Sequence, residues 1–466
     1  GRAPLASSEG MWAHLIEKET EDGFGFVLKG RVNDVGYGSI TTPMSLRAFD
    51  TAIKKFGTMS LEELFEPAIN FAENGFMVRP HVNYFWNQIE GAGRVAHIER
   101  VTKFSATEKI YVKSDGTIRK PGEILKNKDM ANTYRQIVEK GIDDFYLGEI
   151  ANKIAADMKS NGGLLTLEDL EDVSVSEVAP LFGSYRGFSI ATNQPPGGGI
   201  MVLQMLNILE NFDLVEMGHN SAEYIATISE AMKISTVDKD RYVGDPNFVD
   251  VPVDKLISKE YAKDMAKKIK SGYKTRVPRL RVAGESQNTT HVCSVDREGN
   301  MVSLTHSLGM PSGVVTDGLG FMYNGCMCVF DPRPGRTGSI QPGKSRFTAM
   351  CPTIVFKENK PVLIIGAPGG TYITMGVLQG ILNTLDFGMD ADRAVAAPRI
   401  CTTSDIIDIT NRIPRFIERE LCEMGYEVRR SAMSYFFAGV HAISFTRDGD
   451  VVGGADPGRD GMAMMG

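Results

Sequence analysis

Four hydroxyl side chains are concentrated in one short part of the chain, at Thr289, Thr290, Thr305 and Ser307. A Thr or Ser hydroxyl is a weak nucleophile until a neighbouring base removes its proton. A Thr at the start of a chain has such a base in its own α-amine, whose reference pKa is about 7.7 to 8.0. Thr and Ser are also common in half-buried strands, so a pair of threonines by itself does not indicate catalysis.

These hydroxyls belong to an expected β-hairpin. Strands are expected over residues 290–295 and 301–308, and the turn between them contains Asp296, Gly299 and Asn300, which favour a tight reversal of the backbone. The hydroxyl side chains are gathered at one end of the first expected strand and along the second.

A second pattern that could support chemistry is the glycine-rich run Gly366-Ala367-Pro368-Gly369-Gly370-Thr371. Before it, a second hairpin is expected, with its first strand within residues 344–355, a turn at Asn359-Lys360-Pro361 and a second strand at 362–365. After it, a helix is expected at 372–385. A strand that ends in glycines at a helix N-terminus is a natural anion site. A glycine-rich helix entry needed only for packing is the alternative interpretation.

Upstream of the hairpin the pattern is mainly helical. Capping boxes are expected at Ser60 to Glu63, where a helix would begin and end near Asn74, and at Thr166 to Asp169. Residues 268–288 have little apolar periodicity and predict either a flexible segment or an ordinary linker. The other expected elements are helices near 44–56, 127–140, 148–160, 200–209 and 221–239 and a strand at 187–192. Gly197-Gly198-Gly199 lacks the Lys-Ser/Thr ending of a phosphate loop, which disfavours nucleotide binding.

The hairpin block resembles the processing site of the gamma-glutamyltransferase family, where Thr-Thr-His, a variable strand, Asp-x-x-Gly-Asn and a Thr-rich second strand recur in this order. The resemblance implies that the precursor cuts its own backbone, and that the first Thr becomes the N-terminal residue of a small subunit and the catalytic nucleophile. A second hydroxyl supports the attack, and two glycines donate N–H groups to the oxyanion. Carried over to this chain, these features are the cut between Asn288 and Thr289, the nucleophile and α-amine base Thr289, the second hydroxyl Ser307, and the oxyanion glycines Gly369 and Gly370.

The resemblance continues through residues 207–213, 240–246 and 454–461, so it covers nearly the whole chain. It implies an α+β fold of the N-terminal-nucleophile hydrolase type, a four-layer αββα sandwich with mainly antiparallel sheets between helical layers. It also implies two subunits from one precursor. Residues 1–288 would form the large-subunit region, with upstream residues missing, and residues 289–466 the small catalytic region. The histidines His291 and His306 are expected to be structural, because the α-amine already supplies the base.

The substrate-binding positions depart from the family pattern. Where the family holds the α-amino and α-carboxylate groups of a glutamyl substrate with Asn, Gln or Glu, Asp and a Ser-Ser pair, this chain has Gly309, Gly325, Cys328 and Thr348-Ala349. The missing Asp matters most, because it pairs with the substrate's ammonium group. The family's Arg would precede Gly1. The residues expected to contact substrate are Thr305, Gly309, Asn324, Thr348 and Ala349.

The resemblance implies a self-processing gamma-glutamyltransferase-like enzyme that cleaves an amide of the gamma-glutamyl type, such as glutathione. The acyl group would pass through a Thr ester to water, an amino acid or a peptide. Two alternatives stay open: an amidohydrolase resembling cephalosporin acylase, with a non-glutamyl substrate, and an uncleaved, inactive relative that acts as a binding or structural protein.

Composition excludes several other classes of protein. The 51 basic and 58 acidic residues give a formal charge of −7, with no basic segment suited to nucleic acid. No run of about 18 apolar residues predicts a membrane span. All six cysteines follow Asn288 and are expected to be mostly reduced and buried, and Cys326-Met327-Cys328 lacks zinc-site spacing. We expect no metal and no organic cofactor; the opening residues 1–5 do not indicate a compartment.

Overall fold

The computed structural model of the chain describes residues 1–20, 25–88, 93–278, 288–433, 436–446 and 449–466. Their contacts define two compact units. The first comprises Gly1–Thr20, Phe24–Glu177 and Leu308–Arg346, and the second includes Val178–Ser307 and Phe347–Gly466. Each unit therefore contains residues from both sides of the predicted cut. The predicted division at residue 288 is a site of backbone cleavage, and the division into units by contacts does not test it.

The first unit is mainly helical. Its largest core cluster contains Ile137, Tyr146, Ile150, Ile154 and Met158. Its helices are α1 (Ser45–Phe56), α2 (Leu61–Asn74), α3 (Pro80–Trp86), α4 (His97–Thr102), α5 (Ser105–Tyr111), α6 (Lys128–Lys140), α7 (Asp143–Leu147), α8 (Glu149–Ser160) and α9 (Leu167–Glu171). Its short paired strands are β1 (Ile16–Glu19) with β2 (Phe26–Leu28), β3 (Phe76–Met77) with β4 (Ile124–Leu125), and β9 (Pro311–Val315) with β10 (Met322–Asn324).

The two predicted capping boxes are confirmed in this unit. Before α2, the Ser60 side chain accepts a hydrogen bond from the Glu63 backbone, and the Glu63 carboxylate accepts one from the Ser60 backbone at 2.7 Å. Thr166 and Asp169 make the same reciprocal pair before α9. Each box satisfies two N–H groups that a helix start otherwise leaves unpaired, which fixes where the helix begins.

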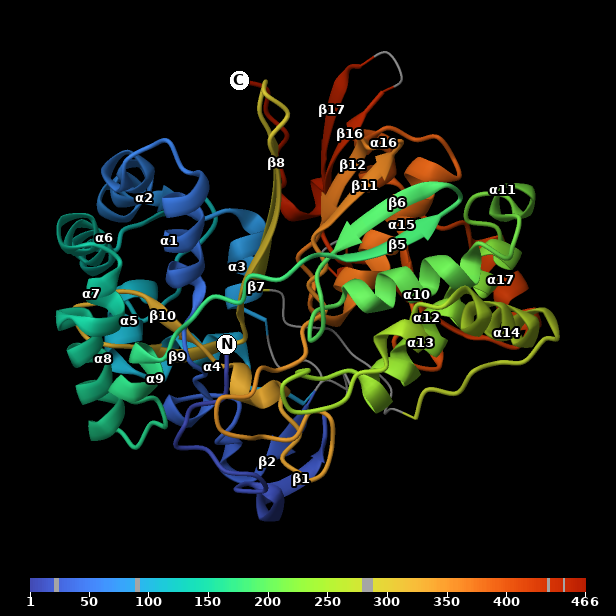
Figure 1. Cartoon of the computed structure of the whole chain (residues 1–466). Helices are drawn as coiled ribbons and strands as arrows, with labels where there is room; N and C mark the ends of the chain where they lie inside the picture. The colour runs from blue at the N-terminus through green and yellow to red at the C-terminus, as the bar shows by residue number, and fades with distance from the viewer. Residues whose placement is uncertain (21–24, 89–92, 279–287, 434–435, 447–448) are drawn as a thin grey trace. The chain divides into compact units, whose positions relative to one another are not determined.

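A six-stranded antiparallel sheet is the centre of the second unit (Figure 1). Every neighbouring pair in it runs antiparallel. The strands in spatial order are β17 (Val451–Ala455), β16 (His441–Phe445), β12 (Lys360–Gly366), β11 (Thr353–Lys357), β6 (Phe188–Thr192) and β5 (Leu181–Tyr185). A smaller sheet of β13 (Ile400–Cys401), β14 (Ile406–Thr410) and β15 (Glu427–Ser431) lies in the same unit.

Apolar helices cover one face of the large sheet. Helix α10 (Gly199–Leu209) is buried along its whole length and contacts β5, β6 and the helices α12 (Ala222–Tyr242), α14 (Lys259–Lys270) and α15 (Ile373–Leu385). Helix α15 packs on β12. A helix that is mostly apolar and buried along its whole length belongs in a core, which agrees with the central position of α10. The remaining helices of this unit are α11 (Leu214–Met217), α13 (Val253–Leu256), α16 (Ala391–Ala396) and α17 (Arg415–Glu423).

The hairpin of β7 (Asn288–Val295) and β8 (Met301–Gly309), yellow in Figure 1, packs on the opposite face of the large sheet. Side chains alternate between the faces of a strand. The Ile365 side chain lies against Gly380 of α15, whereas the face of the next residue, Gly366, lies against His291 of β7. Helices, the large sheet and the hairpin therefore form successive layers, and the predicted α+β class with stacked, mainly antiparallel sheets is confirmed.

The turn of the second hairpin differs from the prediction by about one residue. Strand β11 ends at Lys357 and β12 begins at Lys360, so the two-residue turn is Glu358-Asn359 and not Asn359-Lys360-Pro361. Both turn residues have positive φ, 50° and 62°. This is the backbone requirement of the turns that match strand twist, and Pro361 is accommodated inside β12 beside an irregularity in the register.

The segment predicted to be flexible, residues 268–288, begins later than expected. Its first three residues are the end of α14, where Lys267, Lys268 and Lys270 complement the negative end of the helix dipole. Val277 is 1% exposed, and its N–H donates to the Asp405 carboxylate at 2.8 Å. The flexible alternative is therefore wrong for residues 268–270 and for Val277, and the linker alternative stays a prediction. Residues 279–287 lie outside the described part of the chain.

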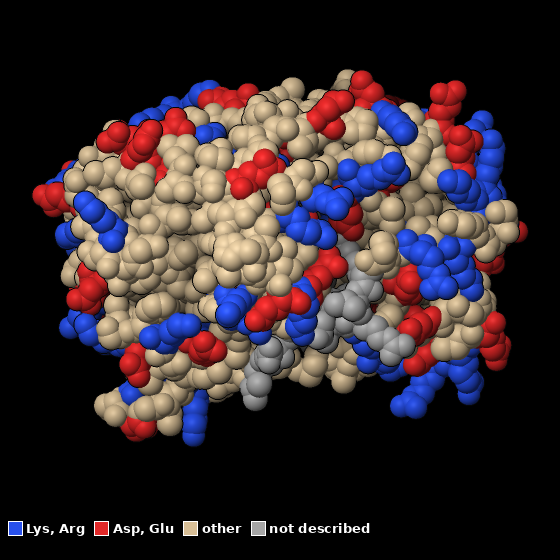
Figure 2. Space-filling model, turned by 90° about the horizontal axis from the view of Figure 1, so that it is seen from below, with Lys and Arg blue, Asp and Glu red and all other residues tan. Residues whose placement is uncertain are grey.

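Charged side chains of both signs are distributed over the face of the molecule seen in Figure 2. Within the described residues, no helix combines the length and the apolar character that a membrane span needs. Four of the six cysteines are buried, and Cys422 is exposed.

Candidate active site

The predicted nucleophile and the predicted second hydroxyl lie together. Thr289 is the second residue of β7 and Ser307 is near the end of β8, and their hydroxyl oxygens share a hydrogen bond of 2.8 Å. Thr289 is partly exposed. A hydroxyl at this distance can accept or donate a proton as Thr289 reacts, and a Ser offers the same donor and acceptors as a Thr.

Cross-strand pairs fix the register of this hairpin. Besides the pair of Thr289 with Ser307, the Nδ1 atom of His291 and the Thr305 hydroxyl are 2.9 Å apart. A step of two residues forward on β7 thus corresponds to two residues back on β8, as in an antiparallel pair. By the same register Cys293 lies opposite Ser303. The hydroxyls of Thr289 and Thr305 therefore share one face of the hairpin, and the exposed Thr290 is on the other.

His291 fills the space between the hairpin and the large sheet. A Cβ added to Gly366 would lie 2.1 Å from the His291 ring, so only glycine permits this packing. The Nε2 atom of His291 is 3.2 Å from the sulfur of Cys293, whose thiol donates to the carbonyl of His441 at 3.6 Å. In this arrangement Nε2 donates to the sulfur and Nδ1 accepts from Thr305.

Burial keeps this histidine neutral. Burial, and secondarily the charge of His441, lowers the pKa of His291 to about 3. Burial also raises the pKa of the Cys293 thiol to about 12. Neither side chain is therefore an ionised acid or base at neutral pH, which agrees with the expectation that His291 is structural.

The predicted oxyanion glycines follow the end of β12. Ser303 donates to the carbonyl of Ile365 at 3.1 Å, and His291, which is nearer the start of β7, lies against Gly366. Residues nearer the start of β7 therefore lie beside residues nearer the end of β12. Thr289, at the start of β7, is thus at the end of the sheet from which the chain continues to Gly369 and Gly370.

The backbone of this glycine pair is one that other residues rarely adopt. Gly369 has a φ of 144° and Gly370 a φ of 56°. A Cβ on Gly369 would lie 2.6 Å from Cα of Ala438. Among the described residues, no group accepts a hydrogen bond from the N–H of Gly369 or of Gly370. The two amides lead into the short helix Gly370–Tyr372 and then α15, where a developing negative charge is favoured.

Two of the predicted substrate-binding residues lie beside the N-terminus of α10. The Thr348 N–H donates to the carbonyl of Pro196 at 2.9 Å, and the Gly198 N–H donates to that of Met350 at 2.9 Å. Ala349 is buried, and a Cβ on Gly198 would lie 2.5 Å from its carbonyl oxygen. This segment is thus held by its backbone, and the Ala349 side chain has no hydrogen-bonding group to offer a ligand.

Two more of the five predicted substrate-binding residues, Gly309 and Asn324, belong to the first unit, whereas Thr305 belongs to the second. Gly309 has a φ of 68°, and the sulfur of Cys326 occupies the position a side chain would need. The Asn324 oxygen accepts from the N–H and hydroxyl of Thr41 and from the N–H of Cys326, and its NH₂ donates to the Thr41 carbonyl at 2.8 Å. Substrate binding by Asn324 would have to replace these bonds, so its predicted role stays a prediction.

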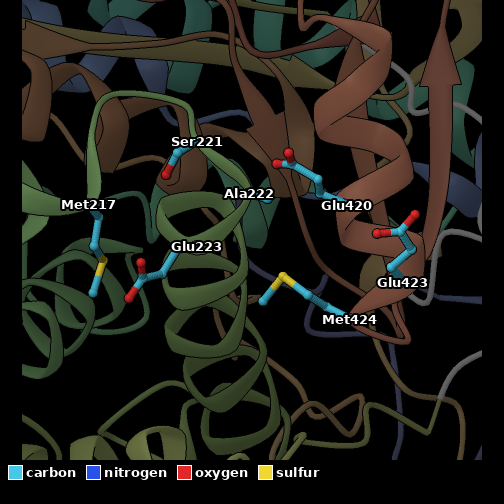
Figure 3. A pocket seen from close by; sticks show the side chains of 7 residues that line it. All are labelled: Met217, Ser221, Ala222, Glu223, Glu420, Glu423 and Met424. Atoms are coloured by element: carbon cyan, nitrogen blue, oxygen red, sulfur yellow. The ribbon is translucent and has the colours of Figure 1, made fainter.

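A separate cavity in the second unit contains none of the predicted site residues. Its volume is about 510 Å³, and Figure 3 shows side chains from the end of α11 and the start of α12 on one side and from α17 and its end on the other. Ser221 there caps α12 by accepting from the Tyr224 N–H at 3.1 Å. The lining residues are Met217, Ser221, Ala222, Glu223, Glu420, Glu423 and Met424. Three carboxylates give it an acidic rim.

Comparison with known proteins assigns the whole chain to a family. All residues from 1 to 466 match the family described as Gamma-glutamyltranspeptidase. The chain belongs to the gamma-glutamyltranspeptidase family. It is 35% identical over 431 residues to the Acylase ACY 1 proenzyme of Pseudomonas sp. (strain SE83), covering 92% of this chain and 75% of the relative. It is 33% identical over 452 residues to the Glutathione hydrolase proenzyme of Bacillus subtilis (strain 168), covering 91% and 74%.

A solved structure agrees with this assignment. The cephalosporin acylase from Bacillus halodurans has a TM-score of 0.86 and 28% identity, over 99% of this chain and 83% of that one. This gamma-glutamyltranspeptidase-family chain is therefore an enzyme with the N-terminal-nucleophile hydrolase fold, and the proenzyme names of its relatives agree with self-processing into two subunits.

The neutral, buried His291 makes stability depend on pH. Its pKa is about 3 in the folded chain and about 6.5 when exposed, so the unfolded chain binds more protons between these values. The contribution is fully present above pH ~6.5 and is lost as pH falls toward 3. Between those limits the difference in unfolding free energy between wild type and His291→Gln should shrink by up to about 1.4 kcal/mol per pH unit. Denaturant unfolding of both proteins from pH 7 to 4 measures it, and a constant difference would contradict the assignment.

Proposed function

We propose that this enzyme cuts itself before Thr289 and then cleaves amides through a Thr289 acyl-enzyme. The observation that carries the proposal is the 2.8 Å hydrogen bond between the hydroxyls of Thr289 and Ser307. It occurs at the end of the sheet where the glycine pair begins. Nucleophile, supporting hydroxyl and oxyanion donors are the three parts that acyl transfer needs.

In the first reaction the Thr289 hydroxyl attacks the carbonyl carbon of Asn288 and its proton passes to the departing backbone nitrogen. The C–N bond breaks, and an ester joins Asn288 to the Thr289 oxygen. Water hydrolyses this ester, leaving a carboxylate on Asn288 and a free α-amine on Thr289. That amine, with a reference pKa of about 7.7 to 8.0, is the base for later turnovers.

In each turnover the amine accepts the Thr289 hydroxyl proton as the oxygen attacks the substrate amide. Gly369 and Gly370 donate N–H groups to the oxyanion, and the same proton is delivered to the leaving nitrogen. Water, an amino acid or a peptide then attacks the ester and releases the acyl group. The residues proposed for this chemistry all belong to the second unit.

The acyl group is proposed to be of the gamma-glutamyl type. A specific observation favours a second candidate, an acyl group without an α-ammonium. Cys328 stands where the family has its ammonium-binding Asp, and burial raises the pKa of its thiol to about 12, so it stays uncharged. An Asp supplies a negative charge that this thiol does not.

Two matched substrates test the proposal. γ-Glutamyl-p-nitroanilide and glutaryl-p-nitroanilide differ only in the α-amino group, so the ratio of their kcat/KM values reports ammonium recognition. A preference of about 10-fold or more for the glutamyl compound is expected if an ammonium contact is present, and a reversed preference supports the second candidate. Release of p-nitroaniline is followed by absorbance, with Thr289→Ala as control. Turnover of neither compound by the processed protein would contradict the proposed function.

A further inference from the structure

The turn Asp456-Pro457-Gly458-Arg459-Asp460-Gly461 has no part in the chemistry proposed above, although it is one of the most distinctive stretches of the sequence. Its residues fold back on themselves: the N–H of Arg459 donates to the Asp456 carbonyl at 3.1 Å, and the Asp456 carboxylate accepts from the Gly458 N–H at 2.7 Å. Buried Asp456 also pairs with the buried Arg399. The turn is thus held rigidly at its first residue.

Residues 437–440 lie between this turn and the glycine pair. The N–H of Gly439 donates to the carbonyl of Pro368 at 2.9 Å. The backbone of Ala438 lies directly behind Gly369, where a Cβ would come within 2.6 Å. The ring centroids of Phe437 and of Tyr372, two residues after Gly370, are 6.4 Å apart. The position of this segment therefore limits how the Gly369 peptide can be oriented.

Arg459 connects the turn to this segment in two ways. Its Nη2 atom donates to the carbonyl of Phe437 at 2.7 Å. Its aliphatic stem covers Gly439, because a Cβ added there would lie 2.4 Å from Cγ of Arg459. A guanidinium donor to a carbonyl is a charge-assisted bond, stronger than a bond between neutral groups, and the stem adds packing.

We propose that Arg459 is a positioning residue for the Gly369–Gly370 oxyanion site. It fixes the carbonyl of Phe437 and the backbone of Gly439, and these hold Ala438 and Pro368 against Gly369. This inference rests on the proposed function of the glycine pair. Donors that stabilise a transition state must be oriented before charge develops, and a segment free to shift would let the Gly369 N–H turn away.

Arg459→Ala tests the proposal in the full-length, processed enzyme. Loss of one oxyanion donor costs on the order of 10² to 10³ in rate, and a misoriented donor costs less, so we expect kcat to fall about 10- to 100-fold with KM changed less than about 3-fold. Arg412→Ala is the matched control: Arg412 also donates to a backbone carbonyl, that of Ala396, at 2.6 Å. Its kcat should equal that of wild type.

Chemical rescue separates orientation from a general loss of stability. Guanidinium chloride at millimolar concentration should restore part of the Arg459→Ala activity, whereas sodium chloride at the same ionic strength should not. A destabilised protein would instead lose activity in guanidinium. Unchanged kcat in Arg459→Ala, or an effect confined to KM or to the melting temperature, would overturn the proposal. If the Arg459 proposal fails in this way, the proposed function still stands as long as wild type is active and Thr289→Ala is inactive in the same assay.

Discussion

Thr289→Ala should remain a single chain and should lose amide cleavage on the order of 10⁴-fold or more, because nucleophile and base are removed together. The hydroxyl is deleted by the substitution. The α-amine never becomes free because the backbone before it stays intact. The expected measurement is release of p-nitroaniline by purified wild type and variant, together with a denaturing gel that reports the state of the chain.

Two variants make this result specific. Thr289→Ser keeps a hydroxyl in hydrogen-bond reach of Ser307, so processing and some turnover should survive. Thr290→Ala removes a neighbouring hydroxyl that is exposed on the opposite face of β7, so it should behave as wild type. Loss of processing in Thr290→Ala, or full activity in Thr289→Ala, would place the nucleophile elsewhere.

Gly369→Ala is expected to lower kcat by on the order of 10² to 10³ or more, the effect of losing one oxyanion donor. The added methyl group would lie 2.6 Å from Cα of Ala438, and the φ of 144° disfavours any side chain. The peptide that carries the N–H must therefore rotate or move. Steady-state kinetics of the processed variant would show the loss in kcat and little change in KM.

Gly388→Ala is the matched control for that substitution. Gly388 also has positive φ, 62°, but a Cβ there meets nothing within 4 Å. The variant carries the backbone penalty of a non-glycine residue with positive φ, of order 1 kcal/mol, without disturbing the predicted site. Equal kcat losses in the two variants would mean that strain in the unit, and not the oxyanion site, accounts for the effect.

The local elements of this fold could be predicted because their signals are short. Capping boxes at Ser60 and Thr166 and the turn residues between β7 and β8 each act within a few positions of the chain. The hydrogen bond between Thr289 and Ser307 agrees with the role that the family resemblance implied for the second hydroxyl. The Glu358-Asn359 turn was misplaced because Pro361 resembled a turn residue although it lies inside a strand.

Contacts between distant segments could not be predicted from one sequence. The His291 ring fills the space that a side chain at position 366 would need. His291 is 75 residues earlier in the chain, and nothing in the sequence near Gly366 indicates this contact. The backing of Gly369 by Ala438 and the bond from Arg459 to Phe437 likewise depend on how loops meet at the end of a sheet. The glycines themselves were the available signal. Each one indicates that another group approaches the backbone closely, but it does not indicate which group.

The sheet also explains how a cut chain would stay assembled. Strand β6, before the predicted cut, pairs with β11, after it, in the register Thr192 with Thr353. Severing the backbone between Asn288 and Thr289 leaves that pairing and the shared core intact. The proposed large- and small-subunit regions would therefore stay paired through this sheet after processing.

The most direct test of the proposed mechanism is the intact mass of the purified protein under denaturing conditions, beside Thr289→Ala. The account predicts two pieces in wild type, the second beginning at Thr289 with an unmodified α-amine, and one uncut 51.0 kDa chain in the variant. A single 51.0 kDa chain in both samples would contradict it, because Thr289 would then have no amine to act as its base.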